Sequence, residues 1–131
     1  MEEKNRFSIL ARVKSSNHAW RGLGILIKTS HNMWAGIFTG LLAVYLGFIL
    51  NISSTEWLFL IFAIFLVLIA EGFNTAIEID INLTSPEYHP YARDTKDVAA
   101  AAVLLSVFVA IIVGLIVFLP KIILYANINI S

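Results

Sequence analysis

The chain has 131 residues, of which 59% are hydrophobic and 14% are charged, and its mean hydropathy is +0.83. Soluble domains carry about a quarter charged residues, so this composition excludes an ordinary soluble domain and indicates a single-domain membrane protein. Cysteine is absent, which excludes disulfides and thiolate metal ligands. A chain this short cannot enclose a wide cavity alone, and we therefore expect an oligomer whose deep site is shared between copies.

The first 33 residues predict one or two amphipathic helices. Six of the nine Lys and Arg residues fall before residue 30, although the net charge of the chain is zero. Phe7 and Val13 fall on one side of such a helix, and Arg6 and Lys14 fall on another. This arrangement suits a helix that lies on a membrane surface. The segment lacks a compact apolar run and a small-residue cleavage site, so we do not expect a secretory signal peptide.

Three apolar stretches follow, and each is long enough to cross a bilayer, which requires about 20 residues. These predicted spans cover residues 34–52, 55–83 and 97–119. At the start of the second span, Ser54 or Thr55 is expected to cap a helix that has Glu56 in its first turn. The third span reaches Pro120, beyond which Lys121 is expected to mark the membrane interface.

The positions of the basic residues predict an orientation in the membrane. The amino-terminal segment is basic, and the turn at 51–56 has no basic residue. The loop between the second and third spans carries Arg93 and Lys96, whereas the carboxyl end carries only Lys121. Because basic residues concentrate on the cytoplasmic side, we expect the amino terminus and the 84–95 loop to be cytoplasmic.

The last third of the second span carries a polar stripe. Glu71, Asn74 and Glu78 are spaced i, i+3 and i+7, so they share one helical face, with the two carboxylates about 10 Å apart along the axis. Exposing Glu71 to lipid would cost several kcal/mol, so it must face a neighbouring helix or a wet cleft. This favours a functional site, although a polar contact that only holds helices together is an alternative. Asp80 points to the other side.

The loop "SPEYHPYARDTKD" is dense in groups that can bind a ligand. Pro86 and Pro90 restrict its backbone. Lys96 and Asp97 are expected at the start of the third helix, where unpaired N–H groups favour an anion. This combination suits a metal-bound polyphosphate, with an ordinary solvated turn as the alternative. Neither a Walker-type loop nor a G-x-G-x-x-G loop occurs in the chain.

The segment "EGFNTAIEIDINLTSPEYHPYARDTKDVAAAAVLL" resembles the signature of the prokaryotic integral-membrane diacylglycerol kinase and undecaprenol kinase family. That signature runs E-x-x-N-[ST]-A-I-E, then E/K-Y-H, then A-K-D-x-[AG]-[AS]-A-V, and "RVKSSNHAWRGLGILIK" matches the family more loosely. The resemblance implies an all-α membrane protein with three transmembrane helices and an amino-terminal amphipathic surface helix, assembled as a homotrimer in the bacterial inner membrane. It also implies transfer of the γ-phosphate of MgATP to a lipid hydroxyl, that of undecaprenol or diacylglycerol, and no nucleic-acid partner.

The resemblance assigns roles to individual residues. Glu71 stands at the position of the catalytic base, and Glu78 at that of a magnesium-binding carboxylate. Asn74 and Trp20 stand at positions that give polar support to the substrate. The nucleotide-contacting positions correspond to Arg12, Glu78, Glu87, Tyr88, His89, Lys96 and Asp97.

Ser30 departs from the family pattern. It stands where the family has a glutamate that serves as the second metal ligand, and a hydroxyl is a weak neutral ligand compared with a carboxylate. This departure favours one alternative function, a catalytically impaired family member with a scaffold role. Another alternative is a small oligomeric ion or proton transporter in which Glu71 and Glu78 form a relay.

The predicted orientation can be tested with single cysteines in this cysteine-free chain. We expect an impermeant thiol reagent to label Ser54→Cys and Asn129→Cys on intact cells, and to label Thr84→Cys only after the membrane is permeabilised. The wild-type chain is the unlabelled control. Labelling of Thr84→Cys alone on intact cells would reverse the orientation.

Overall fold

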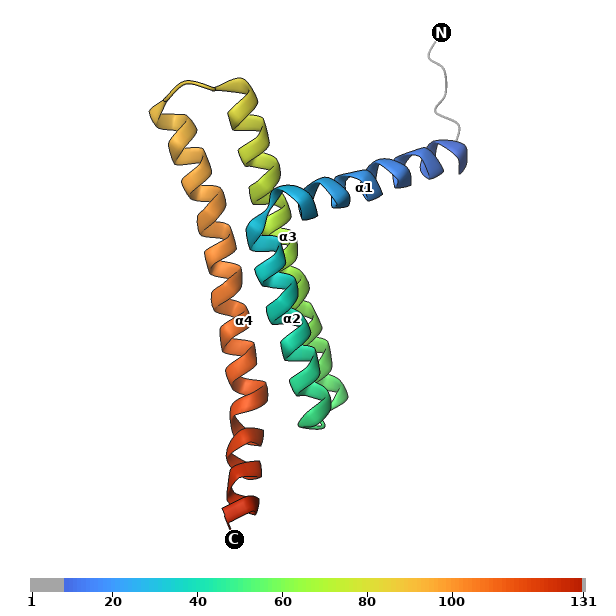
Figure 1. Cartoon of the computed structure of the whole chain (residues 1–131), viewed down its shortest axis with the longest axis vertical. Helices are drawn as coiled ribbons and strands as arrows, with labels where there is room; N and C mark the ends of the chain where they lie inside the picture. The colour runs from blue at the N-terminus through green and yellow to red at the C-terminus, as the bar shows by residue number, and fades with distance from the viewer. Residues whose placement is uncertain (1–8, 131) are drawn as a thin grey trace.

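The computed structural model consists of four α-helices joined by short connections (Figure 1). It describes residues 9–130, with side chains for residues 15–127. The helices are α1 (Ile9–Thr29), α2 (His31–Ile49), α3 (Ser54–Thr84) and α4 (Pro90–Ile130). Because the described residues form helices and no strands, the predicted all-α fold is confirmed.

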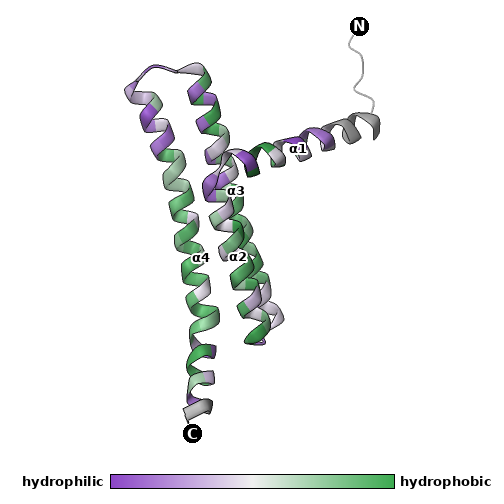
Figure 2. Ribbon diagram, viewed as in Figure 1, coloured by the Kyte–Doolittle hydropathy of each residue, from purple (hydrophilic) through white to green (hydrophobic). Residues whose placement is uncertain are grey.

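The helices α2, α3 and α4 run side by side, with α3 in contact with both of the others (Figure 1). The helix α1 contacts α2 and α3 at one end and projects away from the bundle (Figure 1). The helices α2, α3 and α4 are long and apolar enough to cross a membrane, as the sequence predicts. Figure 2 shows that hydrophilic residues gather on α1 and on the ends of α3 and α4 that meet at their connecting loop. The bundle is therefore apolar along most of its length and polar at the end where α1 joins it.

A capping box starts α3, and its cap is Ser53 rather than the predicted Ser54 or Thr55. The Glu56 backbone N–H donates to Ser53 Oγ at 3.3 Å, and the Ser53 backbone N–H donates to Glu56 Oε2 at 2.6 Å. A capping box requires the acidic residue three positions after the cap, and only Ser53 has that spacing to Glu56. The prediction was wrong by one residue for this reason.

The helix α4 is longer at both ends than the third predicted span. It begins at Pro90, whose fixed φ and missing N–H suit the first helical position. Lys96 and Asp97 therefore lie in its second turn, and the prediction that they start the helix was wrong. At the other end, α4 continues through Pro120, because a lost hydrogen bond is tolerated when packing holds a transmembrane helix. Lys121 Nζ lies 3.2 Å from a Glu56 carboxylate oxygen and ties this part of α4 to the start of α3.

Glycines allow α2 to pack closely on α3. Gly40 is buried, and a Cβ added there would lie 2.9 Å from Cγ2 of Ile64 on α3. In membranes, where lipid is as apolar as the side chains, such close backbone approach is a main source of helix association. The α2–α3 turn is closed at Asn51, which has a φ of 49°, a left-handed conformation that asparagine tolerates better than most residues.

The packing at Gly40 predicts a specific destabilisation. We expect Gly40→Ala to lower stability by about 1–3 kcal/mol, because Ile64 is β-branched and cannot easily turn aside. Gly114→Ala is the matched control, since a Cβ at Gly114 meets no atom of the described residues within 4 Å. Unfolding by SDS titration in mixed micelles measures both. Equal shifts in the two variants would contradict the packing described here.

Candidate functional site

The polar stripe of α3 lies where the apolar part of the helix ends. A rise of about 1.5 Å per residue places Glu71 roughly 25 Å and Glu78 roughly 36 Å along the helix from Ser54. The hydrocarbon core of a bilayer is about 30 Å thick. If Ser54 lies at one edge of the core, Glu71 lies just inside the opposite edge and Glu78 lies beyond it.

Glu71 is buried at the junction of α1 and α2. Its side chain is only 4% exposed, and Ser30, between these two helices, donates a hydrogen bond from Oγ to Glu71 Oε1 at 2.6 Å. The other carboxylate oxygen, Oε2, is buried and has no hydrogen-bond partner in the described part of the chain. As predicted, Glu71 faces neighbouring helices rather than lipid. An unpaired buried carboxylate oxygen is costly, so its retention favours a functional role.

The α1–α2 junction and α3 enclose a polar cleft of about 270 Å³. It is lined by Thr29, Ser30, His31, Asn32, Glu71, Asn74, Thr75 and Glu78. The predicted stripe is therefore confirmed as one face of α3. Within it, Asn74 Nδ2 donates to Glu78 Oε1 at 3.1 Å, one helical turn away. Glu78 itself is exposed, so its carboxylate remains accessible to a ligand.

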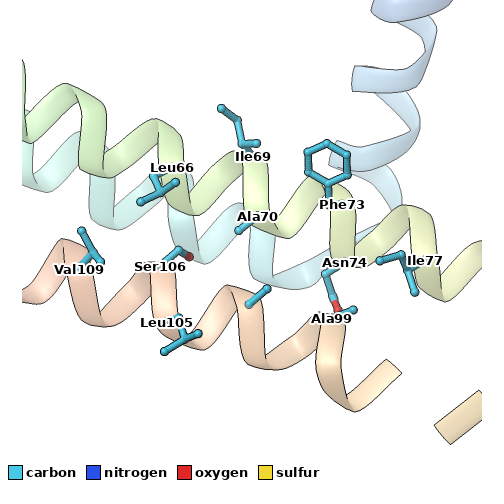
Figure 3. A pocket seen from close by; sticks show the side chains of 11 residues that line it. Leu66, Ile69, Ala70, Phe73, Asn74, Ile77, Ala99, Leu105, Ser106 and Val109 are labelled. Carbon is cyan, nitrogen blue, oxygen red and sulfur yellow. The ribbon is translucent and has the colours of Figure 1, made fainter. Parts of the chain in front are cut away.

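An apolar groove of about 530 Å³ runs between α3 and α4 (Figure 3). It is lined by Leu66, Ile69, Ala70, Phe73, Asn74, Ile77, Ala99, Ala102, Leu105, Ser106 and Val109. Asn74 lines both the groove and the polar cleft. Its side-chain oxygen points toward α4 at Ala99 in Figure 3, is buried and has no partner among the described residues. The apolar groove and the polar cleft thus meet at one amide group.

A third hollow, the loop cleft, has a volume of about 330 Å³ and lies between the end of α3 and the start of α4. It is lined by Ile81, Asn82, Ser85, Pro86, Glu87, Tyr88, His89, Ala92, Arg93, Lys96 and Asp97. The structure therefore brings together the five predicted nucleotide-contacting residues of the loop and α4. Most side chains that line the loop cleft are polar, unlike those of the apolar groove, so the loop cleft suits a hydrophilic ligand.

Asn82 is a site residue that the sequence reasoning missed. Lys96 Nζ donates to Asn82 Oδ1 at 2.6 Å, which fixes the ammonium group at the wall of the loop cleft. Asn82 follows Glu71 by eleven residues, close to three full turns, so it extends the Glu71, Asn74 and Glu78 stripe. Continuing the stripe by one turn would have found it.

The remaining predicted site residues differ in their exposure and in how they relate to these hollows. Trp20 is 70% exposed on α1 and does not line the polar cleft. Arg12 lies in α1, but its side chain is outside the described residues. Asp97 forms an exposed i,i+4 ion pair with Arg93 at 3.6 Å, which contributes little to stability. Tyr88 is 78% exposed at the mouth of the loop cleft.

The donors of the polar cleft fit a magnesium ion that arrives with a nucleotide. Among residues 15–127, no three His, Asp or Glu side chains cluster tightly enough to form a metal cage. Magnesium in phosphate-transfer sites commonly uses one or two carboxylates, with water and phosphate as the remaining ligands. Accessible Glu78 supplies one carboxylate of this kind.

A model of the prokaryotic diacylglycerol kinase family matches residues 17–118, which is most of the chain and includes every lining residue of the polar cleft, the apolar groove and the loop cleft. The chain belongs to the prokaryotic diacylglycerol kinase family. The chain is 34% identical over 119 residues to the undecaprenol kinase of Bacillus subtilis (strain 168), covering 91% of this chain and 93% of that protein. It is 33% identical over 101 residues to the diacylglycerol kinase of Escherichia coli (strain K12), covering 76% of this chain and 82% of that protein.

The residues that match the family model include Ser30, the α3 stripe and the loop cleft. The predicted resemblance is thereby confirmed. The roles assigned to individual residues, including those of Glu71, Glu78 and Lys96, stay predictions.

Proposed function

We propose that this chain is a lipid kinase that transfers the γ-phosphate of ATP, bound with Mg²⁺, to the hydroxyl of a membrane lipid alcohol of the undecaprenol or diacylglycerol kind. The observation that carries the proposal is the position of Asn74, which lines both the apolar groove and the polar cleft. A lipid alcohol has an apolar tail and a polar reacting group. The apolar groove matches the tail, and the polar cleft matches the reacting group. The names of the B. subtilis and E. coli relatives support the same two lipid classes.

The acceptor lipid enters from the side of the bilayer. Its tail lies along the apolar groove, and its hydroxyl reaches the level of Asn74 and Glu71, near the edge of the hydrocarbon core. The Oδ1 of Asn74 faces the groove at the level that the hydroxyl reaches, while Nδ2 keeps its bond to Glu78. The lipid hydroxyl has a single proton to donate, and that proton is directed at Glu71.

Glu71 acts as the general base. Its Oε2 takes the proton of the lipid hydroxyl as that oxygen forms a bond to the γ-phosphorus, and the bond from phosphorus to the bridging oxygen of ADP breaks. The products are a lipid phosphate and ADP, and the proton is left on Glu71 for release to water. No covalent phosphoenzyme is needed.

The nucleotide occupies the loop cleft, with its phosphates directed toward Glu78. Asn82, at the wall of this cleft, lies one turn of α3 beyond Glu78, about 6 Å along the axis. Lys96, held by Asn82, neutralises phosphate charge, and Arg12 is proposed to do the same from α1. Bound Mg²⁺ would neutralise charge on the phosphate oxygens, and Glu78 is the residue that would hold it.

Two other functions are less well supported. An ion or proton relay would use Glu71 and Glu78, but it gives no role to the loop cleft or to the Lys96–Asn82 bond. A scaffold role rests on Ser30 alone. We also propose that the enzyme is a homotrimer in the bacterial inner membrane, as the family resemblance implies. Large apolar side chains cover the exposed faces of α2–α4, which suits contact with lipid. We place α1 and the 84–95 loop in the cytoplasm because most of the basic residues lie there.

The two carboxylates of the polar cleft are expected to affect different steps. Glu71→Gln keeps the side-chain shape and removes the proton acceptor, so turnover should fall by about 10²-fold or more while ATP binding stays nearly intact. Glu78→Gln should also weaken magnesium-dependent nucleotide binding. Asp80→Asn is the matched control, because Asp80 is an exposed carboxylate of the next turn that does not line the polar cleft. Radiolabelled phosphate transfer and equilibrium ATP binding measure these effects in purified protein, and near wild-type turnover in Glu71→Gln would refute the mechanism.

The Lys96–Asn82 bond predicts an effect on nucleotide affinity alone. Asn82→Ala releases the ammonium group of Lys96, so we expect the KM for ATP to rise about 3- to 10-fold with little change in kcat. Thr84→Ala is the control, since Thr84 is exposed and its hydroxyl bonds only to the Asp80 carbonyl of its own helix. A change in kcat without a change in the KM for ATP would show that Asn82 acts elsewhere.

A further inference from the structure

The Ser30 hydroxyl makes two hydrogen bonds, one as an acceptor and one as a donor. As the N-cap of α2, its Oγ accepts the Met33 backbone N–H at 3.0 Å. The same hydroxyl donates to Glu71 Oε1 at 2.6 Å. Ser30 is 8% exposed and Glu71 is 4% exposed, so water competes little with either bond.

These bonds determine where the single hydroxyl proton of Ser30 lies. A serine hydroxyl has one proton to donate, and the N–H of Met33 already approaches its oxygen as a donor. The proton is therefore directed at Glu71, and the bond to a carboxylate is of the stronger, charge-assisted kind. Oε1 is occupied by this bond, and Oε2 is the carboxylate oxygen that remains without a partner.

We propose that Ser30 is a positioning residue for Glu71: its hydroxyl holds Oε1 against the start of α2 and leaves Oε2 as the oxygen that accepts the proton of the lipid hydroxyl. This inference rests on the proposed function. It gives residue 30 a role toward the base in place of the metal-ligand role that the resemblance suggests for this position. Serine in place of the family's glutamate at position 30 then changes how the Glu71 carboxylate is held.

The contact between Ser30 and Glu71 is more than a consequence of helix capping. An N-cap satisfies the first N–H groups of its own helix and requires no partner on another helix. Glycine is also accepted at N-caps, at a cost of only a few tenths of a kcal/mol relative to serine. Ser30→Gly thus removes the donor to Glu71 with little effect on the start of α2, and it separates the two roles.

The kinetic test uses the purified full-length protein in lipid nanodiscs, with ATP and a lipid alcohol as substrates. We expect Ser30→Gly to lower kcat about 10-fold and to leave the KM for ATP and the half-saturating magnesium concentration within about 2-fold of wild type. Ser30→Thr, which keeps the hydroxyl, should recover most of the lost kcat. Wild-type kcat in Ser30→Gly, no recovery in Ser30→Thr, or a raised magnesium requirement would overturn the proposal, the last by making Ser30 a metal ligand.

A second measurement does not depend on activity. In a double-mutant cycle, Ser30→Ala and Glu71→Leu are compared singly and together by SDS-induced unfolding. We expect Ser30→Ala to lower the unfolding midpoint clearly in the wild-type chain and by a smaller amount when residue 71 is leucine, because the bond is then already absent. Equal shifts in the two backgrounds would disprove the contact. If wild type transfers no phosphate while the cycle shows coupling, the proposed function fails and the contact stands as a structural one.

Discussion

A carboxylate near the edge of the hydrocarbon core must be shielded from lipid, and much of this structure follows from that constraint on Glu71. Before Glu71, the helix α3 has fourteen consecutive uncharged residues, from Trp57 to Ala70, so this part of the helix suits the hydrocarbon core. The junction of α1 and α2 covers Glu71 and supplies the Ser30 hydroxyl, which satisfies one carboxylate oxygen. The cost of burying the charge is thereby reduced, and one oxygen is left available for chemistry.

The same transition along α3 places three hollows in order along the helix. The apolar groove lies against the middle of the helix, the polar cleft follows at Glu71 and Asn74, and the loop cleft lies beyond Glu78. A lipid that enters sideways and a nucleotide that enters from water would approach the stripe from its two ends. The order arises from a simple sequence property, the change from continuous apolar residues to a polar residue on every turn of one face.

The sequence alone predicts the features that depend on periodicity and composition: the all-α fold, the three apolar helices and the shared face of Glu71, Asn74 and Glu78. It does not predict contacts that depend on how helices cross. Ser30 and Glu71 are 41 residues apart, and their hydrogen bond follows from the placement of the α1–α2 junction on α3. The sequence also leaves the start of α4 open, because a proline in a polar segment can either restrict a loop or begin a helix, and Pro90 begins a helix.

Whether this arrangement phosphorylates a lipid hydroxyl is tested most directly by a phosphate-transfer assay with γ-labelled ATP on purified protein. Undecaprenol and diacylglycerol are offered side by side in otherwise identical nanodiscs, and organic-phase and aqueous label are counted separately. We expect labelled lipid phosphate from at least one of the two alcohols, dependent on added lipid. Labelled inorganic phosphate alone, or no transfer with either alcohol, would contradict the proposed function.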